Sequence, residues 1–234
     1  MPAQSTGKLA KVKLGTMHVG WIAAIVFWSL GVVGTLWWIT DYEFSTTGND
    51  ADAAVTHWPS DSALKLSSQR PTLVFFMHPK CPCTRASLRE LRRLLEASTI
   101  ADAELPVVIV VVNQPRGADA AWRDTDTVRD AAILPRVTMI TDAGSLESDR
   151  FGAVTSGAVM LFDTTGARLF AGGVTTSRGH EGDSAGCDML RRLLKKEAPA
   201  GPLTFPTFGC RLCVPGESAE DEPVCTENCH EPLP

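Results

Sequence analysis

Two cysteines separated by one residue are the strongest chemical signal in the chain. Cys81 and Cys83 lie in the segment HPKCPCT, between a short apolar run and a stretch with helical periodicity. A thiol at a helix N-terminus faces unpaired backbone N–H groups and the positive end of the helix dipole, which both favour the thiolate. The pattern predicts that Cys81 is an exposed nucleophile with a lowered pKa, and that Cys83 resolves the mixed disulfide that Cys81 forms.

Three neighbours of this pair are predicted to shape its chemistry. Lys80 and His78 add positive charge, which stabilises a thiolate, and Thr84 follows Cys83. A disulfide between residues two apart is strained and easily reduced, so the site is expected to be relatively oxidising. The residues leave three other interpretations open. Cys81, Cys83 and His78 could bind a soft metal such as Cu(I), Thr84 could leave one working thiol, or the pair could be unused on a docking scaffold.

The elements that must position this loop have the pattern of an α/β domain. Apolar, β-branched runs alternate with amphipathic segments, which predicts a mainly parallel sheet, and a late hairpin adds an antiparallel edge. The expected strands are 71–77, 106–112 and 137–141, with the hairpin 158–162 and 168–171; the expected helices are 84–97, 118–132, 146–151 and 183–196. The domain is predicted to span residues 70–198, which is long enough for one hydrophobic core.

A buried strand, a cysteine loop that opens a helix, and a late hairpin followed by a helix together resemble the thioredoxin fold, a central mixed sheet flanked by helices. The resemblance covers about residues 71–210. The extra helix–strand pair between Asn113 and Asp142 resembles the membrane-anchored TlpA-like and peroxiredoxin-like branch. More narrowly, FGAVTSGAVMLFDTTGARLFAGGVTTSRGHEGD at 151–183 and TFGC at 207–210 are similar to bacterial RedB-type proteins. The resemblance implies thiol–disulfide exchange with protein thiols and disulfides of the cell envelope.

The resemblance also implies which loop faces Cys81. Related proteins carry a cis-proline there, which pairs with the substrate backbone and keeps metals away from the thiols. The matching stretch here is Thr155-Ser156-Gly157, without a proline. Ser156 and Gly157 are therefore expected to face the cysteines, with hydroxyl groups in place of the proline and a glycine that tolerates unusual backbone angles.

The segment 178–183 opens the last helix of the domain. Arg178 and His180 either line the cleft and tune Cys81 or belong to a well-capped loop, and His180 is the stronger candidate. Cys187, one turn into that helix, is expected to be a packed core thiol.

A 21-residue run without charge, 19–39, is long enough to cross a bilayer. Three lysines and no acid precede it, whereas after residue 40 all 27 acids face only 19 Lys and Arg. The positive-inside rule then places an N-terminal tail, 1–18, in the cytoplasm, a membrane helix at 19–40, and the rest on the other side of the membrane. With the resemblance to bacterial envelope proteins, this implies a bacterial inner membrane with the domain in the periplasm. Residues 41–69 are polar and aperiodic, which predicts a flexible tether.

The C-terminal segment, 199–234, is rich in proline and holds four cysteines, Cys210, Cys213, Cys225 and Cys229, so it is expected to be stapled by disulfides. The alternative is a zinc or copper site formed by these four cysteines and His230. The sequence contains no nucleotide or flavin motif, no cofactor is expected, and a net charge of −5 gives no reason to expect nucleic acid as a partner.

Overall fold

The computed structural model describes residues 7–46, 55–97, 100–101, 105–197 and 203–213, with side chains from residue 19 onward. The chain divides into two compact units, Met1–Glu43 and Phe44–Pro234. The first unit is formed by one helix, α1 (Gly7–Phe44). Its part Val19–Phe44 has a mean hydropathy of 2.0 and is long and apolar enough to cross a membrane. The helix begins ahead of the apolar run, so the predicted boundary at residue 19 marks a change in polarity and not the start of the helix.

The second unit is built on a six-stranded mixed sheet with the order β3-β2-β1-β4-β5-β6. Strands β1, β2 and β3 are parallel, β4 is antiparallel to both β1 and β5, and β5 and β6 are parallel. The strands are β1 (Thr72–Met77), β2 (Val107–Gln114), β3 (Val137–Ala143), β4 (Val159–Phe162), β5 (Arg168–Gly172) and β6 (Leu203–Thr204). With helices on both faces, this is a thioredoxin-like fold, as predicted.

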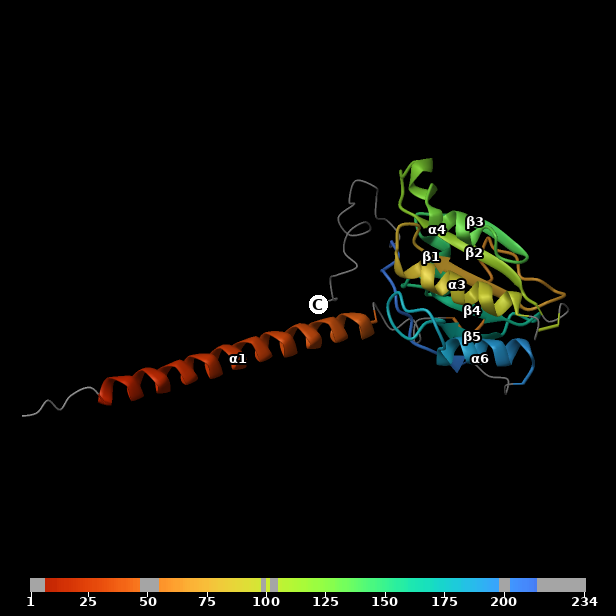
Figure 1. Ribbon diagram of the computed structural model, residues 1–234. Helices are drawn as coiled ribbons and strands as arrows, with labels where there is room; N and C mark the ends of the chain where they lie inside the picture. The colour runs from red at the N-terminus through yellow and green to blue at the C-terminus, as the bar shows by residue number, and fades with distance from the viewer. Residues whose placement is uncertain (1–6, 47–54, 98–99, 102–104, 198–202, 214–234) are drawn as a thin grey trace, which may run out of the picture. The chain divides into compact units, whose positions relative to one another are not determined.

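All six residues of β1 are buried because both faces of the central strand are covered. Helices α3 (Cys83–Glu96) and α6 (Ala185–Leu194) pack on one face, in front of the sheet in Figure 1. They do so through leucines at helical spacing, Leu88, Leu91, Leu94 and Leu95 on α3 and Leu190, Leu193 and Leu194 on α6. Helix α5 (Leu146–Phe151) covers the other face.

The helix predicted over 118–132 is interrupted. It forms a 3₁₀ turn, η2 (Ala120–Arg123), and a short helix, α4 (Asp126–Ala131). Thr125 lies between them with an extended backbone, and its hydroxyl accepts a hydrogen bond from the N–H of Val128. Because an N-cap residue starts a new helix, the break follows from Thr125.

The flexible tether predicted over 41–69 does not extend to residues 55–69, which pack on the domain. The Trp58 ring lies edge-on to Phe151 and Phe162, with 5.1 Å between ring centroids in both pairs. Leu64 is buried in the same cluster. The sequence pattern failed because a few anchoring side chains, and no periodicity, hold this segment in place.

The predicted end of the domain at residue 198 is also wrong. Residues 203–213, which we call the C-terminal strap, add β6 to the sheet edge and continue across the domain. Phe205 stacks on Phe170 with 5.4 Å between ring centroids. Phe208, Leu212 and Cys213 are buried. The strap is therefore a part of the domain.

Candidate functional site

The two cysteines lie where β1 ends and α3 begins. Pro82 is the N-cap residue of α3 and supplies no side-chain hydrogen bond to the helix. Cys81 precedes it, in a turn where its N–H bonds the carbonyl oxygen of His78 at 3.2 Å. Cys81 is 1% exposed and Cys83 7% exposed. The expected helix N-terminus is present, but the expected exposure of Cys81 is wrong.

Hydrogen bonds lower the pKa of Cys81 to about 6 from the ordinary value of 9.0. The largest cause is the hydrogen bond from the Cys83 thiol; the Thr84 hydroxyl and the backbone N–H groups of Cys210 and Thr84 add to it, against the effect of burial. The thiolate is thus stabilised by four donors, and the predicted charges of Lys80 and His78 are not among the causes.

The same contact acts in the opposite direction on Cys83. Its pKa is raised because its proton is held by Cys81, and burial and the negative charge of Cys81 add to this effect. Arg178 opposes the rise through its positive charge and a hydrogen bond. The pair therefore holds one thiolate, on Cys81, and one thiol, on Cys83.

His78 and Lys80 contact Trp122, a residue that the sequence analysis did not single out. Lys80 Nζ lies 4.2 Å from the centroid of the indole, and the His78 ring is edge-on to it, 5.3 Å away. His78 Nδ1 also accepts the N–H of Lys80 at 3.2 Å. Trp122 is fixed by a hydrogen bond from its Nε1 to the carbonyl oxygen of Asn113 at 3.0 Å. The two basic residues thus shape the loop that carries Cys81.

The loop at residues 155–157 lies beside the cysteine loop, as the resemblance implies. Ser156 Oγ is 2.6 Å from the Thr84 hydroxyl and accepts the N–H of His78 at 2.8 Å. Gly157 has a φ of +98°, and a Cβ there would lie 3.0 Å from Ser87 Oγ. The position therefore requires glycine. Thr84 is a partner of both Cys81 and Ser156 and so joins the two loops.

The C-terminal strap completes the site, which the sequence analysis did not predict. The N–H of Cys210 donates to Cys81 Sγ at 3.4 Å, and the side chains of Cys81, Cys83 and Cys210 form a buried cluster. Cys210 and Cys213 are both disulfide-bonded. Two signals in the sequence pointed to this region, the similarity of TFGC to RedB-type proteins and the cysteines expected to form disulfides, but neither placed it next to Cys81.

Arg178 and His180 have different surroundings. Arg178 Nη1 donates to the carbonyl oxygen of Gly209 at 2.8 Å and also interacts with Cys83. His180 is exposed and has no hydrogen bond to either cysteine. Arg178, and not the favoured His180, is therefore the residue of this segment that reaches the thiols.

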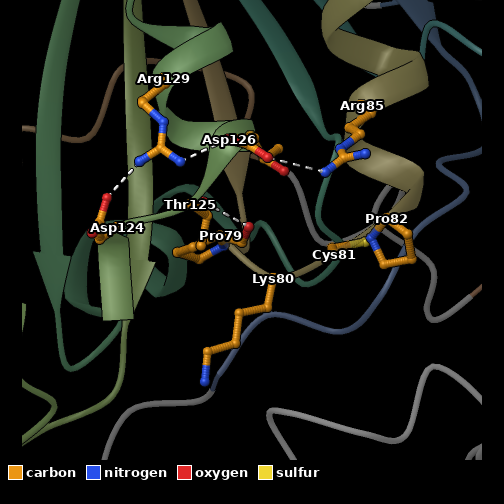
Figure 2. A pocket seen from close by; sticks show the side chains of 10 residues that line it. Pro79, Lys80, Cys81, Pro82, Arg85, Asp124, Thr125, Asp126 and Arg129 are labelled. Atoms are coloured by element: carbon orange, nitrogen blue, oxygen red, sulfur yellow. Dashed lines mark hydrogen bonds and ion pairs between the residues drawn. The ribbon is translucent and has the colours of Figure 1, made fainter. Parts of the chain in front are cut away.

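An open pocket of about 420 Å³ leads to Cys81 from the side of α4 (Figure 2). Pro79, Lys80 and Pro82 from the cysteine loop line it together with residues of α3 and α4. Its rim is charged: Arg129 bonds Asp124 at 2.5 Å and Asp126 at 2.6 Å, and Arg85 lies 4.0 Å from Asp126. The pocket thus brings polar and charged side chains next to the buried Cys81.

The described residues contain no group of three or more His, Cys, Asp or Glu side chains that could hold a metal ion. His78, Cys81 and Cys83 accordingly do not form a three-ligand set in this geometry. In the C-terminal alternative, Cys210 and Cys213 are disulfide-bonded and not thiolate ligands, and Cys225, Cys229 and His230 lie outside the described residues.

Comparison with known proteins finds similar folds only among solved structures. An uncharacterized conserved protein from Geobacillus kaustophilus shares 15% identity over 75% of this chain and 94% of its own, with a TM-score of 0.51. A hypothetical protein from Sinorhizobium meliloti shares 16% identity over 74% and 95%, with a TM-score of 0.49. A secreted Mycobacterium tuberculosis disulfide oxidoreductase shares 17% identity over 56% and 84%, with a TM-score of 0.38. No family model and no curated protein matches the sequence.

Proposed function

We propose that this protein is a membrane-anchored thiol–disulfide exchange protein in which Cys81 is the nucleophile and Cys83 the resolving thiol. The observation that carries the proposal is that the pKa values of Cys81 and Cys83 are shifted in opposite directions. The pKa of Cys81 falls to about 6, so the reactive thiolate is present at neutral pH. Cys83 keeps its proton next to it.

The exchange requires two steps. The Cys81 thiolate attacks one sulfur of a substrate disulfide that enters from the pocket, and the other substrate sulfur leaves as a thiolate and takes a proton from water. Cys83 then loses its proton and attacks Cys81 Sγ, which releases the second substrate thiol. Two electrons pass to the substrate, and the pair becomes a disulfide. Two thiols of another protein, which become a disulfide themselves, must reduce the pair again.

The first step prepares the second. Once Cys81 is part of a mixed disulfide, it carries no negative charge and no longer holds the Cys83 proton, so two causes of the raised pKa of Cys83 disappear. The interactions with Arg178 remain and favour the Cys83 thiolate. Cys83 is therefore expected to become nucleophilic only when a substrate is attached to Cys81.

The proposal includes a location at the bacterial inner membrane. Helix α1 would be a single-pass anchor, with the three lysines of its N-terminal part in the cytoplasm and the domain in the periplasm. Substrates would then be thiols and disulfides of envelope proteins. Protease added to spheroplasts should digest the domain and spare an N-terminal epitope tag. Protection of the domain in intact spheroplasts would refute this orientation.

The proposal also includes the narrower relation to RedB-type proteins. It is supported by the position of the two segments that suggested it. Ser156 and Arg178 belong to the first segment and Cys210 to the second, and all three lie at the cysteine pair.

The exchange mechanism can be tested on the full chain in detergent, freed of metal and equilibrated in a series of glutathione redox buffers. Trypsin releases Cys81 and Cys83 together in peptide 81–85, whose alkylation is counted by mass spectrometry. We expect the pair to convert between two thiols and one disulfide. If the two sulfurs never pair, the dithiol mechanism is excluded, and a stoichiometric Cu(I) complex that Cys83→Ser abolishes would favour a metal carrier instead.

A further inference from the structure

We propose that Cys210 is an internal redox partner of Cys81, so that the disulfide that Cys210 forms exchanges electrons with the Cys81–Cys83 pair inside one chain. The inference rests on the proposed function, because it requires Cys81 to react as a thiolate. It adds a third reacting sulfur and an electron store that neither the resemblance nor the comparisons assign.

The first support is the contact between the two sites. Cys210 donates its N–H to Cys81 Sγ at 3.4 Å, and its side chain belongs to the same buried cluster as Cys81 and Cys83. These two cysteines are free thiols, whereas Cys210 is disulfide-bonded. A thiolate and an oxidised sulfur are thus held side by side, which is the arrangement that disulfide exchange requires.

The second support is that backbone hydrogen bonds hold the strap in register. The carbonyl oxygen of Cys210 accepts the N–H of Ser156 at 2.8 Å, and the N–H of Leu212 donates to Val154 at 2.8 Å. Thr155 and Arg211 form an antiparallel bridge between these bonds. The strap therefore lies on the loop at 154–156 as an added strand, and this pairing fixes which residue meets Cys81.

Side chains and a close backbone approach fix the same register. Arg178 bonds the carbonyl oxygen of Gly209, and Asn113 Oδ1 accepts the N–H of Cys213 at 2.9 Å. A Cβ on Gly209 would lie only 2.0 Å from the backbone oxygen of Ser156. Only glycine allows the strap to come this close, so residue 209 determines whether Cys210 can reach Cys81.

The strap and the pocket contact Cys81 through different sets of residues. Pocket residues come from the cysteine loop, α3 and α4 and the residues just ahead of it, whereas the strap contacts the loop at 154–156 and Arg178. An external disulfide can therefore use the pocket while the strap stays in place. Cys81 would exchange with both, first with one and then with the other.

The internal exchange balances without another reagent. The Cys81 thiolate attacks Cys210 Sγ, a Cys81–Cys210 bond forms, and the sulfur that was bonded to Cys210 leaves as a thiolate and takes a proton from water. Cys83 then loses its proton and attacks Cys81 Sγ, which frees Cys210 as a thiolate. Two electrons pass from the pair to the disulfide of Cys210, and the reverse sequence returns them.

The test uses the full-length Cys83→Ser variant, in which Cys81 can form a mixed disulfide that Cys83 cannot resolve. The chain is incubated with oxidised glutathione as the external disulfide, quenched with acid, alkylated and digested with trypsin without reduction. Cys81 is then the only cysteine of peptide 81–85, Cys210 the only one of 197–211, and Cys187 the only one of 179–191. A linkage of Cys81 to Cys210 or to Cys187 therefore has its own mass, which also differs from that of a linkage to peptide 212–234, the peptide that holds the other three cysteines.

We expect two products, the glutathione adduct of 81–85 and the cross-link between 81–85 and 197–211. An adduct without the cross-link would overturn the internal exchange and leave the proposed function intact. Absence of both products would overturn both proposals. A cross-link between 81–85 and 179–191 in comparable yield would show random exchange in an opened chain, and would also overturn the inference.

A second variant keeps the test valid if Cys83→Ser does not fold. Gly209→Ala in the otherwise unchanged chain should displace the strap, so that a pair reduced by one equivalent of dithiothreitol no longer passes its electrons to the disulfide of Cys210 once the reagent is removed. Cys81 should still react with glutathione disulfide. Cys187→Ser is the matched control, since Cys187 is a buried core residue of α6. In this variant, both the reaction of Cys81 with glutathione disulfide and the exchange with Cys210 should persist. Electron transfer from the pair to the disulfide of Cys210 that survives in Gly209→Ala would refute the role of the strap contact.

Discussion

A buried cysteine lies at the start of each of two helices, Cys81 just ahead of α3 and Cys187 in the first turn of α6, yet the two thiols differ in acidity. Cys81 is 1% exposed and has a pKa of about 6, whereas Cys187 is 3% exposed and has a pKa of about 11. Burial raises the pKa of both. The difference must therefore come from what else each sulfur contacts.

The two helices are capped in different ways. In α6 the hydroxyl of Ser184 accepts a hydrogen bond from the N–H of Cys187 at 3.0 Å. This N–H at the start of the helix is therefore bonded to an oxygen and not to a cysteine sulfur. In α3 the N-cap residue is Pro82, which has no acceptor in its side chain. The Cys81 sulfur takes the N–H of Thr84 instead. The largest cause of the difference is the hydrogen bond from the Cys83 thiol, which has no counterpart among the causes at Cys187, and the Thr84 N–H at the uncapped start of α3 adds to it.

The largest expected effect is on the reaction itself. Cys81→Ser should abolish exchange with glutathione disulfide, because the nucleophile is lost, and Cys187→Ser should leave the rate unchanged. Mixed-disulfide formation followed by mass spectrometry measures both. Retained exchange in Cys81→Ser would mean that another thiol reacts, and the contrast between the two helices would have no functional meaning.

The next effect is the pH dependence of alkylation. At pH 7, a pKa of about 6 leaves about 90% of Cys81 as thiolate, whereas a pKa of about 11 leaves about 0.01% of Cys187. Alkylation of Cys81 by iodoacetamide should therefore decline as the pH falls through about 6, and Cys187 should stay unmodified in the folded chain. Equal rates for the two cysteines at neutral pH would contradict the assignment.

Stability should respond to pH in opposite directions at the two sites. The pKa of Cys81 lies below the ordinary value of 9.0, so its contribution is present above pH 9 and is lost as the pH falls toward 6. The pKa of Cys187 lies above 9.0, so its contribution is present below pH 9 and is lost as the pH rises through about 11. Urea unfolding of each Cys→Ser variant across this range, compared with the parent chain, should show the two opposite trends.

A smaller effect is expected when one donor to Cys81 is removed. Thr84→Val takes away the hydroxyl that bonds both Cys81 and Ser156, and should raise the pKa of Cys81. Alkylation at pH 6 should slow several-fold, with little change at pH 9. Ser87→Ala, at a buried hydroxyl of the same helix that is not among the causes of the shift, is the matched control. An unchanged pH profile in Thr84→Val would show that the hydroxyl does not act on the thiolate.

The smallest effect should come from the cap of α6. Ser184→Ala removes the acceptor of the Cys187 N–H and should destabilise the domain by about 1 kcal/mol, with a loss of a few degrees in Tm. The pH profile of Cys81 should not move. A change in that profile would mean that the two helix ends are coupled, and the comparison between them would fail.

Most of the fold could be predicted from local patterns. The strands around Val74 and Ile109 are continuous apolar runs, and the leucines of α3 repeat at helical spacing. The local pattern of each segment is therefore enough to predict whether it forms a strand or a helix. Residues 55–69 and the strap have no such period. They are held in place by individual contacts with residues far away in the sequence. Trp58 packs on Phe151, about a hundred positions away, and Gly209 lies against Ser156, about fifty positions away.

The difference between local patterns and distant contacts also explains which site residues could be predicted. Cys81, Cys83 and Thr84 are neighbours in the sequence, so their chemistry could be inferred from spacing, although the burial of Cys81 could not. Cys210 and Trp122 come from distant segments and meet the loop only in the folded chain. Charge at Lys80 was expected to act on the sulfur, but the ammonium group lies over an aromatic ring instead.

That ring gives the protein an optical reporter of its own. Trp122 touches His78 and Lys80, so its emission should change whenever the loop that carries Cys81 moves. Trp58, the other tryptophan of the described part of the domain, packs on Phe151 and Phe162 and should not respond. The difference in fluorescence between the parent chain and Trp122→Phe would follow events at the thiolate in real time, without any added label.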